Sequence, residues 1–319
     1  MKRQAARSDA SVAVATANDG NALHPLQLLE QTGAVAWGVA PAEMVPADEW
    51  ARFEDWLARG LHAGMDYMER YKEIRRDPRL LLEGAHSIIS LAFNYRQPNP
   101  YPEIATYALG RDYHRVLRSR LKKTVSELKK EIGGEWRICI DSAPILERYW
   151  AERCGIGERS PLHGNIVVPS VGSMVFLAEL ITTLDLPPTT APLQKANGRP
   201  KSGAPQKRSV PKGPRPPHPC PTGALLPGGM VDSRRCLNYL TIEHRGEYTP
   251  EELRLLSLPG AKGKLFGCDA CQLGCDYNQT PIEILPDFAP LTDMPRIIDA
   301  LRLGDREAIP SDSPLKRKQ

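Results

Sequence analysis

The stretch GCDACQLGC, residues 267–275, carries three cysteines at the spacing C-x2-C-x3-C. Two more precede it, Cys220 in CPTGA and Cys236 at the end of SRRC, so this part of the chain holds five of the seven cysteines. In a cytosolic chain, closely spaced cysteines favour metal binding over disulfide formation. A metal centre is therefore expected in the C-terminal third.

The spacing matches one half of a two-cluster ferredoxin pattern. In that pattern, C-x2-C-x2-C-x3-C-P gives three thiolates to one [4Fe-4S] cluster and its last thiolate to the other. Only that last cysteine is present here, because the three earlier positions are Val210, Gly213 and Pro216. One complete set of thiolates would remain: Cys220, Cys236, Cys268 and Cys271. Cys275 would be the crossing ligand to the second cluster, without its partners.

The ligand set leaves three outcomes open. At most one [4Fe-4S] cluster is expected, but zinc also accepts four thiolates, and a chain without metal is the third alternative. Cys139 and Cys154 lie outside this segment and are expected to be small buried side chains.

Composition places the chain among ordinary soluble proteins. It has 319 residues, 41% of them hydrophobic and 25% charged, and a formal net charge of +4. No stretch reaches the roughly 20 apolar residues of a membrane span, and the start lacks the apolar core of a signal peptide. We expect a cytoplasmic protein without a membrane partner.

Apolar periodicity predicts an α/β domain from about residue 25 to 185. Short β-rich runs alternate with helical patterns, which is typical of α/β folds. Residues 1–24 are small and polar without a period, and we expect a disordered extension. The expected strands are 86–95, 135–141 and 165–168, and the expected helices are 47–60, 113–132 and 172–184.

Proline and positive charge mark residues 186–219 as a linker. Eleven of the 35 residues from Pro187 to Pro221 are proline, and no acidic residue lies between Asp185 and Asp232. Such a segment cannot bury a core. Its seven Lys and Arg residues form either a solvated loop or a contact for a phosphate backbone. A small cysteine domain, 220–286, follows, and then a C-terminal tail, 287–319.

Several separated motifs resemble the epoxyqueuosine reductase family. They span most of residues 25–280, in this order: HAGMDYM (62–68), RRDPRLLLEGAHSIISLAFNY (75–95), YALGRDYHRVLRSRL (107–121), CIDSAPILER (139–148), VGSMVFLAEL (171–180), VDSRRCLNYLTIEHRG (231–246) and FGCDACQLGCDYN (266–278).

The resemblance implies an α/β (α+β) cobalamin-binding domain related to reductive dehalogenases, followed by a small ferredoxin-like [4Fe-4S] domain. The implied activity is an oxidoreductase that reduces epoxyqueuosine to queuosine at the wobble position of tRNA. Electrons from an external donor would reach cobalamin through iron–sulfur clusters, of which the family has two. The implied partner is the tRNA anticodon loop, and we expect a monomer.

Asp141 is the catalytic residue that the resemblance implies, as a proton donor. It follows the apolar run Ile138–Ile140 at a strand end, where partial desolvation would raise its pKa. Without the resemblance, a helix cap or a salt-bridge partner would be the favoured interpretation of Asp141.

The resemblance places cofactor contacts beside Asp141 and in three other segments. Simple capping and core packing remain alternatives for Asp112, Tyr239 and Thr241, and the stretch 158–163 departs from the family pattern. The expected cofactor-binding residues are Tyr107, Arg111, Asp112, His114, Ser142, Gly157, Gly164, Asn165, Tyr239 and Thr241.

Two hypotheses follow for the whole chain. The first is a reductase that works with one cluster. The second is a degenerate, non-catalytic or impaired member that retains the fold and tRNA binding, with one cluster or a four-cysteine zinc site. The missing cysteines separate this chain from its family, so activity is less secure than membership.

Overall fold

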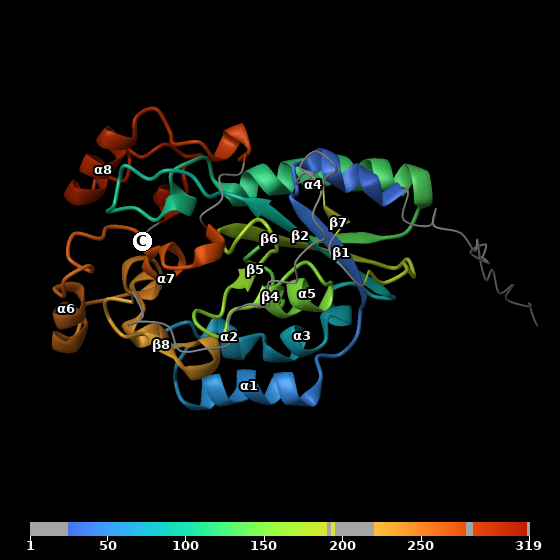
Figure 1. The fold of residues 1–319 in the computed structure, drawn as a ribbon, viewed down its shortest axis with the longest axis horizontal. Coiled ribbons are helices and arrows are strands. Elements are labelled where there is room, and N and C mark those ends of the chain that lie inside the picture. Colours follow the sequence, from blue (N-terminus) through green and yellow to red (C-terminus); the bar gives the residue numbers. More distant parts are fainter. Residues whose placement is uncertain (1–24, 190–192, 195–219, 279–282, 318–319) are drawn as a thin grey trace, which may run out of the picture.

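The computed structural model describes residues 25–189, 193–194, 220–278 and 283–317. The expected N-terminal extension and most of the proline-rich linker lie outside these residues. The described part combines one antiparallel sheet with helices on both faces, followed by a helical cysteine-bearing part at one end of the sheet (Figure 1). The predicted mixture of helices and strands is confirmed, in its α+β form.

Five strands form the central sheet, in the order β3-β6-β2-β1-β7, and all neighbours are antiparallel. Strand β2 pairs along its whole length with β6, so that Ile89 lies opposite Leu180. The strands are β1 (Ala36–Pro41), β2 (Ser87–Asn94), β3 (Trp136–Cys139), β6 (Val175–Thr182) and β7 (Leu193–Gln194).

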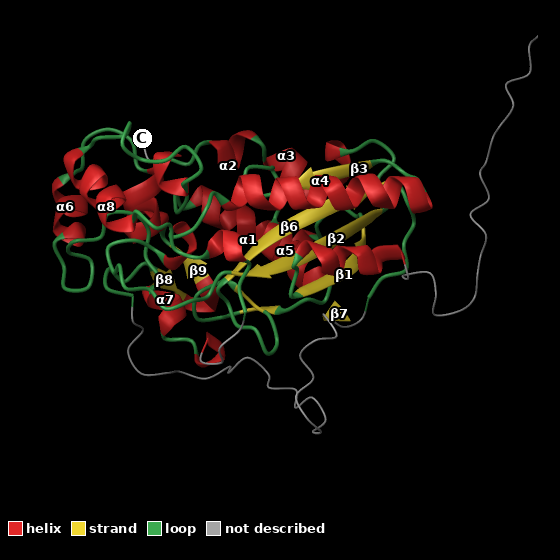
Figure 2. Cartoon of the chain, turned by 90° about the horizontal axis from the view of Figure 1, so that it is seen from above, coloured by secondary structure: helices red, strands yellow, loops and turns green. Residues whose placement is uncertain are grey.

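Both faces of the sheet are covered, so its central strand is buried throughout. All residues of β2 are buried. Because side chains alternate along a strand, Ile89, Leu91 and Phe93 face one apolar layer while Ile88 and Ala92 face the other. Helix α4 (Tyr113–Ile132) covers the first face, and α1 (Ala47–Ala58) and α5 (Glu147–Arg153) cover the second (Figures 1 and 2).

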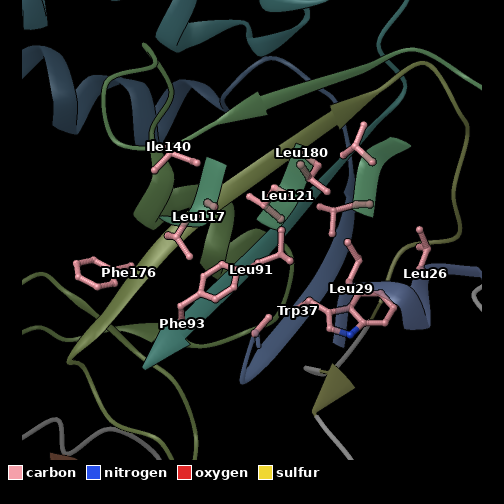
Figure 3. Close-up of a cluster of buried hydrophobic side chains, with 14 of the residues drawn as sticks. Leu26, Leu29, Trp37, Leu91, Phe93, Leu117, Leu121, Ile140, Phe176 and Leu180 are labelled. Atoms are coloured by element: carbon pink, nitrogen blue, oxygen red, sulfur yellow. The ribbon is translucent and has the colours of Figure 1, made fainter. Parts of the chain in front are cut away.

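The layer under α4 is the larger apolar core. Leu117 and Leu121 of the helix are fully buried and pack towards Leu91 and Leu180 of the sheet (Figure 3). The helix begins where Asp112 accepts the amide of His114 and ends at Gly133, whose φ is 74°. Its predicted bounds, 113–132, are confirmed.

The predicted helix over 172–184 is wrong, because this segment is strand β6. Its sequence, VFLAELIT, contains good helix formers and lacks the polar–apolar alternation of a half-exposed strand. A strand buried on both faces needs no alternation, so periodicity cannot separate it from a buried helix. Pairing with β2 and β3 decides the outcome.

The expected C-terminal tail is also corrected. Helix α8 (Met294–Leu303) buries Met294, Ile297 and Ile298 against Ile104 and Leu109. These three side chains recur at the helical spacing i, i+3, i+4, which was present in the sequence and was missed. The segment folds against the loop before α4.

The remaining elements are short. Two-residue hairpin strands β4 and β5 lie beside α5, and β8 and β9 open the cysteine-bearing part. No helix in the described ranges combines the length and apolar character of a membrane span. The other bounds are α2 (Tyr67–Arg70), α3 (Lys72–Arg76), β4 (Glu158–Arg159), β5 (Ile166–Val167), β8 (Leu225–Leu226), β9 (Met230–Val231), α6 (Pro250–Leu256) and α7 (Ala270–Leu273), with a π-helix at Tyr239–Glu243.

Candidate functional site

A cavity of about 240 Å³ lies where the sheet meets the cysteine-bearing part. Its wall mixes two carboxyl groups, a guanidinium, two phenols, polar amides and a hydroxyl with apolar side chains of β5 and β6. The lining residues are Tyr95, Tyr113, Asp141, Glu147, Arg148, Asn165, Ile166, Ser173, Val175, Phe176, Leu177 and Gln272. Pockets with an apolar wall and a few convergent polar groups are typical of ligand sites.

Asp141 lies just beyond the end of β3 and lines this cavity. Its φ is 49°, a left-handed conformation that few residues other than glycine adopt. Its carboxylate accepts from His114, with 2.9 Å between Nε2 and Oδ2. The opposite ring nitrogen of His114 lies 2.8 Å from Oδ1 of the buried Asp112. One imidazole therefore joins a buried carboxylate to a carboxylate at the cavity.

Glu147, the first residue of α5, holds the backbone of Asp141. Its Oε1 accepts the amide of Asp141 at 2.6 Å. Burial, and after it the negative charge of Asp141, raise the pKa of Glu147 to about 8. Two acidic side chains thus share one end of the cavity, and at neutral pH Glu147 keeps its proton more readily than an ordinary glutamate.

The expected desolvation of Asp141 does not describe this site. The Asp141 side chain is 56% exposed, whereas the carboxyl group with the raised pKa belongs to Glu147. The strand ends before Asp141, and the turn that follows aims its carboxylate at the cavity. The sequence prediction identified the correct loop but assigned the desolvated carboxyl group to Asp141 instead of Glu147.

Stacked aromatic rings form the floor of the cavity. Tyr113 stacks on Phe176 with 4.2 Å between ring centroids, and Tyr95 lies 4.6 Å from the same ring. Tyr107 contacts Tyr95, Tyr113 and Phe176 edge-on, just behind the wall. Burial raises the pKa of Tyr113 and of Tyr107 well above the ordinary value, so both rings remain neutral phenols.

The predicted cofactor residues fall into two groups. Asn165 lines the cavity, His114 binds Asp141, and Asp112 and Tyr107 support these from behind. Arg111 points elsewhere and pairs with Asp287 at 2.8 Å and Asp312 at 3.4 Å. It ties the loop before α4 to the C-terminal segment.

Gly157 and Gly164 pack against backbone. A Cβ at Gly157 would lie 2.5 Å from the carbonyl oxygen of Val167, and one at Gly164 would collide with the carbonyl oxygen of Gly229. Both glycines therefore permit close chain approach within the fold. Ser142 is exposed, and its hydroxyl donates to the carbonyl of Ile140.

Four of the predicted metal ligands interact electrostatically, which raises the pKa of three of them, although among the described residues no three of them are placed closely enough to hold one metal ion. Burial, and after it the charges of Cys236, Cys268 and Cys220, raise the pKa of Cys271 to about 12. Burial also raises the pKa of Cys236, to which Cys220 and Cys268 add, and that of Cys268, to which Cys220 adds. Every pair among the four thiols is therefore close enough to interact electrostatically.

Two of these thiols accept hydrogen bonds from backbone amides. The amide of Ala224 donates to Sγ of Cys220 at 3.3 Å, and the amide of Ala270 donates to Sγ of Cys268 at 3.5 Å. Such N–H···S bonds stabilise cluster-bound sulfur. Within the described ranges, no three His, Cys, Asp or Glu side chains form a group that could hold one metal ion. Cys275 lies in the turn after α7, where its amide donates to Gln272.

Tyr239 and Thr241 position this segment. The Thr241 hydroxyl accepts the amide of Gly267 at 2.8 Å, and the side-chain oxygen of Asn238 accepts the amide of Cys268 at 2.8 Å. The Tyr239 hydroxyl accepts the amide of Gly64 at 3.0 Å. These residues fix the turn that carries Cys268.

The turn after Cys271 is clamped to the cavity wall. Asn278 accepts the amide of Ser173 at 2.8 Å, and its Nδ2 donates to Ser173 Oγ and to the Gln272 carbonyl. Gly172, with φ 109°, allows this approach because a Cβ there would collide with Asn278. The cysteine turn and the start of β6 thus form one rigid wall.

The prediction from sequence missed Glu147, Arg148, Tyr95 and Gln272 as lining residues. Glu147 and Arg148 end the segment CIDSAPILER, and Gln272 directly follows Cys271, so their neighbours gave a signal. Tyr95 ends the run HSIISLAFNY, and nothing local distinguishes it from a core residue.

Two family profiles match the chain. Residues 75–142 match "Epoxyqueuosine reductase QueG, DUF1730", and residues 218–278 match "4Fe-4S double cluster binding domain". The second match begins two residues before Cys220, after the positions where the other cysteines would stand. The cysteine segment is therefore a domain of the 4Fe-4S cluster-binding family.

Two solved structures share the fold. An epoxyqueuosine reductase from Bacillus subtilis, with its aspartate catalytic loop swung out of the active site, is 26% identical with a TM-score of 0.67. An epoxyqueuosine reductase with a tRNA-Tyr epoxyqueuosine-modified tRNA stem loop is 24% identical with a TM-score of 0.68. Each alignment covers 92% of this chain and 77% of the other.

Sequence comparison adds close relatives. The epoxyqueuosine reductase of Synechococcus sp. (strain RCC307) is 37% identical over 260 residues, which cover 79% of this chain and 73% of that protein. Other curated epoxyqueuosine reductases are longer, and the chain spans 59% to 61% of them. With this identity, the matching profile and the shared fold, the chain belongs to the epoxyqueuosine reductase family.

Proposed function

We propose that this chain reduces epoxyqueuosine in tRNA to queuosine. The reaction breaks two C–O bonds, forms a C=C bond and releases the oxygen as water, at a cost of two electrons and two protons. The observation that carries the proposal is Asp141, which lines a cavity beside the cysteine turn and is held by His114 and Glu147.

Asp141 is the residue we assign as proton donor to the departing oxygen. It has the exposure needed to reach a ligand in the cavity, and the Bacillus subtilis relative has an aspartate catalytic loop. The imidazole of His114 lies between Asp141 and Asp112 and can return a proton to Asp141 after turnover. Asp112 fixes the orientation of the ring.

The cavity suits one edge of a corrin. Its volume, about 240 Å³, is below the roughly 300–1,000 Å³ of pockets that enclose a whole ligand. Val175, Phe176 and Leu177 offer an apolar wall, and the side-chain oxygen of Gln272 is buried without a hydrogen-bond partner. Bound cobalamin would supply the low-potential cobalt centre that reduces the substrate. Asn165 and Gln272 would hold its edge, beside Tyr95.

The cysteines Cys220, Cys236, Cys268 and Cys271 are the ligands that we assign to one [4Fe-4S] cluster, with Cys275 outside the set. Their electrostatic influence on one another supports the assignment. Cys271 is adjacent to Gln272, so the ligand set and the cavity lie at the same turn. A low-potential one-electron donor would load the cluster.

The substrate partner is a tRNA anticodon loop that carries epoxyqueuosine. The support is the family and a relative solved with such a stem loop. A tRNA substrate places the reaction in the cytoplasm. We propose that the protein acts as a monomer.

Anaerobic reconstitution with iron, sulfide and cobalamin tests the assignment. The protein should bind about four irons per chain and convert epoxyqueuosine in a tRNA stem loop. Asp141→Asn should keep iron and cobalamin and lower kcat by about 10²-fold or more, because the amide cannot donate an acidic proton. Asp48→Asn, an exposed change on α1, should leave kcat unchanged.

Three results would contradict these assignments. Unchanged turnover in Asp141→Asn would remove the proton-donor role. About eight irons per chain would show that the ligand set is incomplete. A loaded protein that binds the stem loop but never converts it would support the non-catalytic alternative.

A further inference from the structure

One polar atom of the cavity wall has no partner. Gln272 is 9% exposed, and its Nε2 donates to the hydroxyl of Tyr95 at 3.1 Å. Its Oε1 is buried and accepts no hydrogen bond from the described residues. A buried carbonyl left without a donor is unfavourable and rare in native folds, so the atom calls for a donor from a ligand.

Three hydrogen bonds hold the backbone and the side chain of Gln272 in place. Its backbone amide donates to Asp269 at 2.8 Å, and its carbonyl accepts from Asn278 at 2.8 Å. Its side chain is fixed by Tyr95, whose ring packs 4.6 Å from Phe176. Because Asn278 also binds Ser173, the position of Gln272 is coupled to the cavity wall at the start of β6. The unpartnered oxygen is thus prearranged.

The neighbours of this oxygen indicate the chemistry of its donor. Burial raises the pKa of Tyr95 far above its ordinary value, so the phenol beside the amide is neutral. A neutral carbonyl next to a neutral phenol suits a neutral N–H donor, whereas the charged side chains of the cavity, Asp141, Glu147 and Arg148, belong to a different segment. The corrin ring carries primary carboxamides on its rim, which are donors of this kind.

We propose that the Gln272 side-chain oxygen, oriented by Tyr95, accepts a hydrogen bond from a carboxamide on the rim of bound cobalamin. The assignment rests on the proposed function, since it needs a corrin in this cavity. Gln272 directly follows the cluster ligand Cys271, and the same turn therefore sets the position of the corrin edge relative to the cluster.

Cobalamin binding to the iron-loaded protein tests this contact. Gln272→Leu keeps the bulk and removes the acceptor, and its Kd for hydroxocobalamin, from equilibrium dialysis, should rise about tenfold with the iron content unchanged. Tyr95→Phe removes only the hydroxyl that orients the amide, and a rise of about two- to fivefold is expected. Gln31→Leu, on the distant Pro25–Thr32 helix, is the matched control and should bind as the wild type.

A set of altered ligands identifies the group that is contacted. In cobalamin monocarboxylic acids one rim propionamide is replaced by a carboxylate, which cannot donate at neutral pH. The wild type should bind one of these acids at least tenfold more weakly than cobalamin, and Gln272→Leu should lose that discrimination.

The results separate this contact from the function. If the wild type binds cobalamin and both Gln272→Leu and Tyr95→Phe bind it equally well, the contact is wrong and the reductase assignment stands. If the wild type binds no cobalamin, the proposed function fails as well. If Gln272→Leu does not fold, equal binding by Tyr95→Phe and no discrimination among the acids by the wild type would overturn the contact.

Discussion

The sheet and the cysteine segment, residues 220–278, are held together in different ways. The sheet lies between two apolar layers, and central side chains such as Leu91 and Phe93 are fully buried. The cysteine segment has short helices, two-residue strands and a small apolar cluster around Leu237, Leu240 and Leu255. The first is stabilised by apolar burial, and the second has little apolar surface to bury.

The raised pKa values of the buried thiols lead us to expect that the cysteine segment depends on a bound metal. Burial raises the pKa of Cys236, Cys268 and Cys271, so without a metal these thiols stay protonated in an environment that disfavours their charge. A metal binds thiolates and releases the protons, and its binding free energy then becomes folding free energy. We expect the sheet to keep its structure without cofactors, whereas the cysteine segment needs its cluster.

The largest test of this contrast is Cys236→Ala. The change removes one of the four proposed ligands, so iron should fall from about four per chain to below one, and turnover should be lost. Hydrogen exchange should rise at least tenfold across 220–278 while the amides of β2 and β6 remain protected. Iron analysis and exchange followed by mass spectrometry measure both effects on the same sample.

Cys275→Ala is the matched control for Cys236→Ala. Its cysteine lies in the same segment and outside the proposed ligand set, so iron and exchange should stay at wild-type values. Equal iron loss in both variants would show that Cys275 is a ligand. Loss of protection in β2 after Cys236→Ala would show that the two regions do not differ as described.

Local signals in the sequence predict those elements of the sheet region whose ends are marked by capping or turn residues. Helix α4 has an aspartate at its start, one apolar face and two glycines after its end, and its bounds are as predicted. Strand β2 is a bounded β-rich run and also matches. Strand β6 and helix α8 failed for different reasons: the first is decided by its partners, and the second has a helical period that was overlooked.

The candidate site shows the same difference between positions set by a single segment and positions set by tertiary contacts. The segment CIDSAP leads to the cavity because strand β3 ends before Asp141, which a single segment can reveal. The Tyr95 hydroxyl and the Gln272 amide are 177 residues apart, and their hydrogen bond follows from the docking of the cysteine turn on the sheet. Positions that depend on docking were therefore missed, and positions at the end of one element were found.

A smaller effect is expected at the junction between the two regions. Asp269, which is 6% exposed, accepts both the amide and the hydroxyl of Thr106 at 2.7 Å. Asp269→Ala would leave the buried Thr106 amide without a partner, at a cost of about 1–3 kcal/mol in the free energy of unfolding. Urea denaturation of the iron-loaded protein measures the loss, and exchange in 220–278 should rise before exchange in β2.

Asp269→Asn separates the acceptor from its charge. The amide oxygen can still accept from Thr106, so most of the stability should return. Thr106→Val keeps the backbone bond to Asp269 and removes the two bonds of the hydroxyl, to Asp269 and from Asn99. If Asp269→Ala unfolds at the same urea concentration as the wild type, this bond does not couple the two regions.

The smallest expected effect is on the free energy of unfolding, through the ionisation of Glu147 at the cavity. Burial and the charge of Asp141 raise the pKa of Glu147 from 4.5 to about 8. Between these values the native state binds a proton that the unfolded chain has lost, so the free energy of unfolding falls as pH rises through this window. Glu147→Gln has no such proton and keeps an oxygen for the Asp141 amide. It should therefore be more stable than the wild type above pH 8, by about 1–2 kcal/mol, since partial exposure reduces the full linkage value.

The measurement is urea denaturation of wild type and Glu147→Gln at several pH values between 5 and 9. The two stability curves should diverge as pH rises, and Glu54→Gln, an exposed change on α1, should follow the wild type. Parallel curves would mean that Glu147 titrates like an exposed glutamate and that its ionisation does not destabilise the sheet region. Diverging curves would show that the sheet region stays folded although it holds a destabilising carboxyl group beside Asp141.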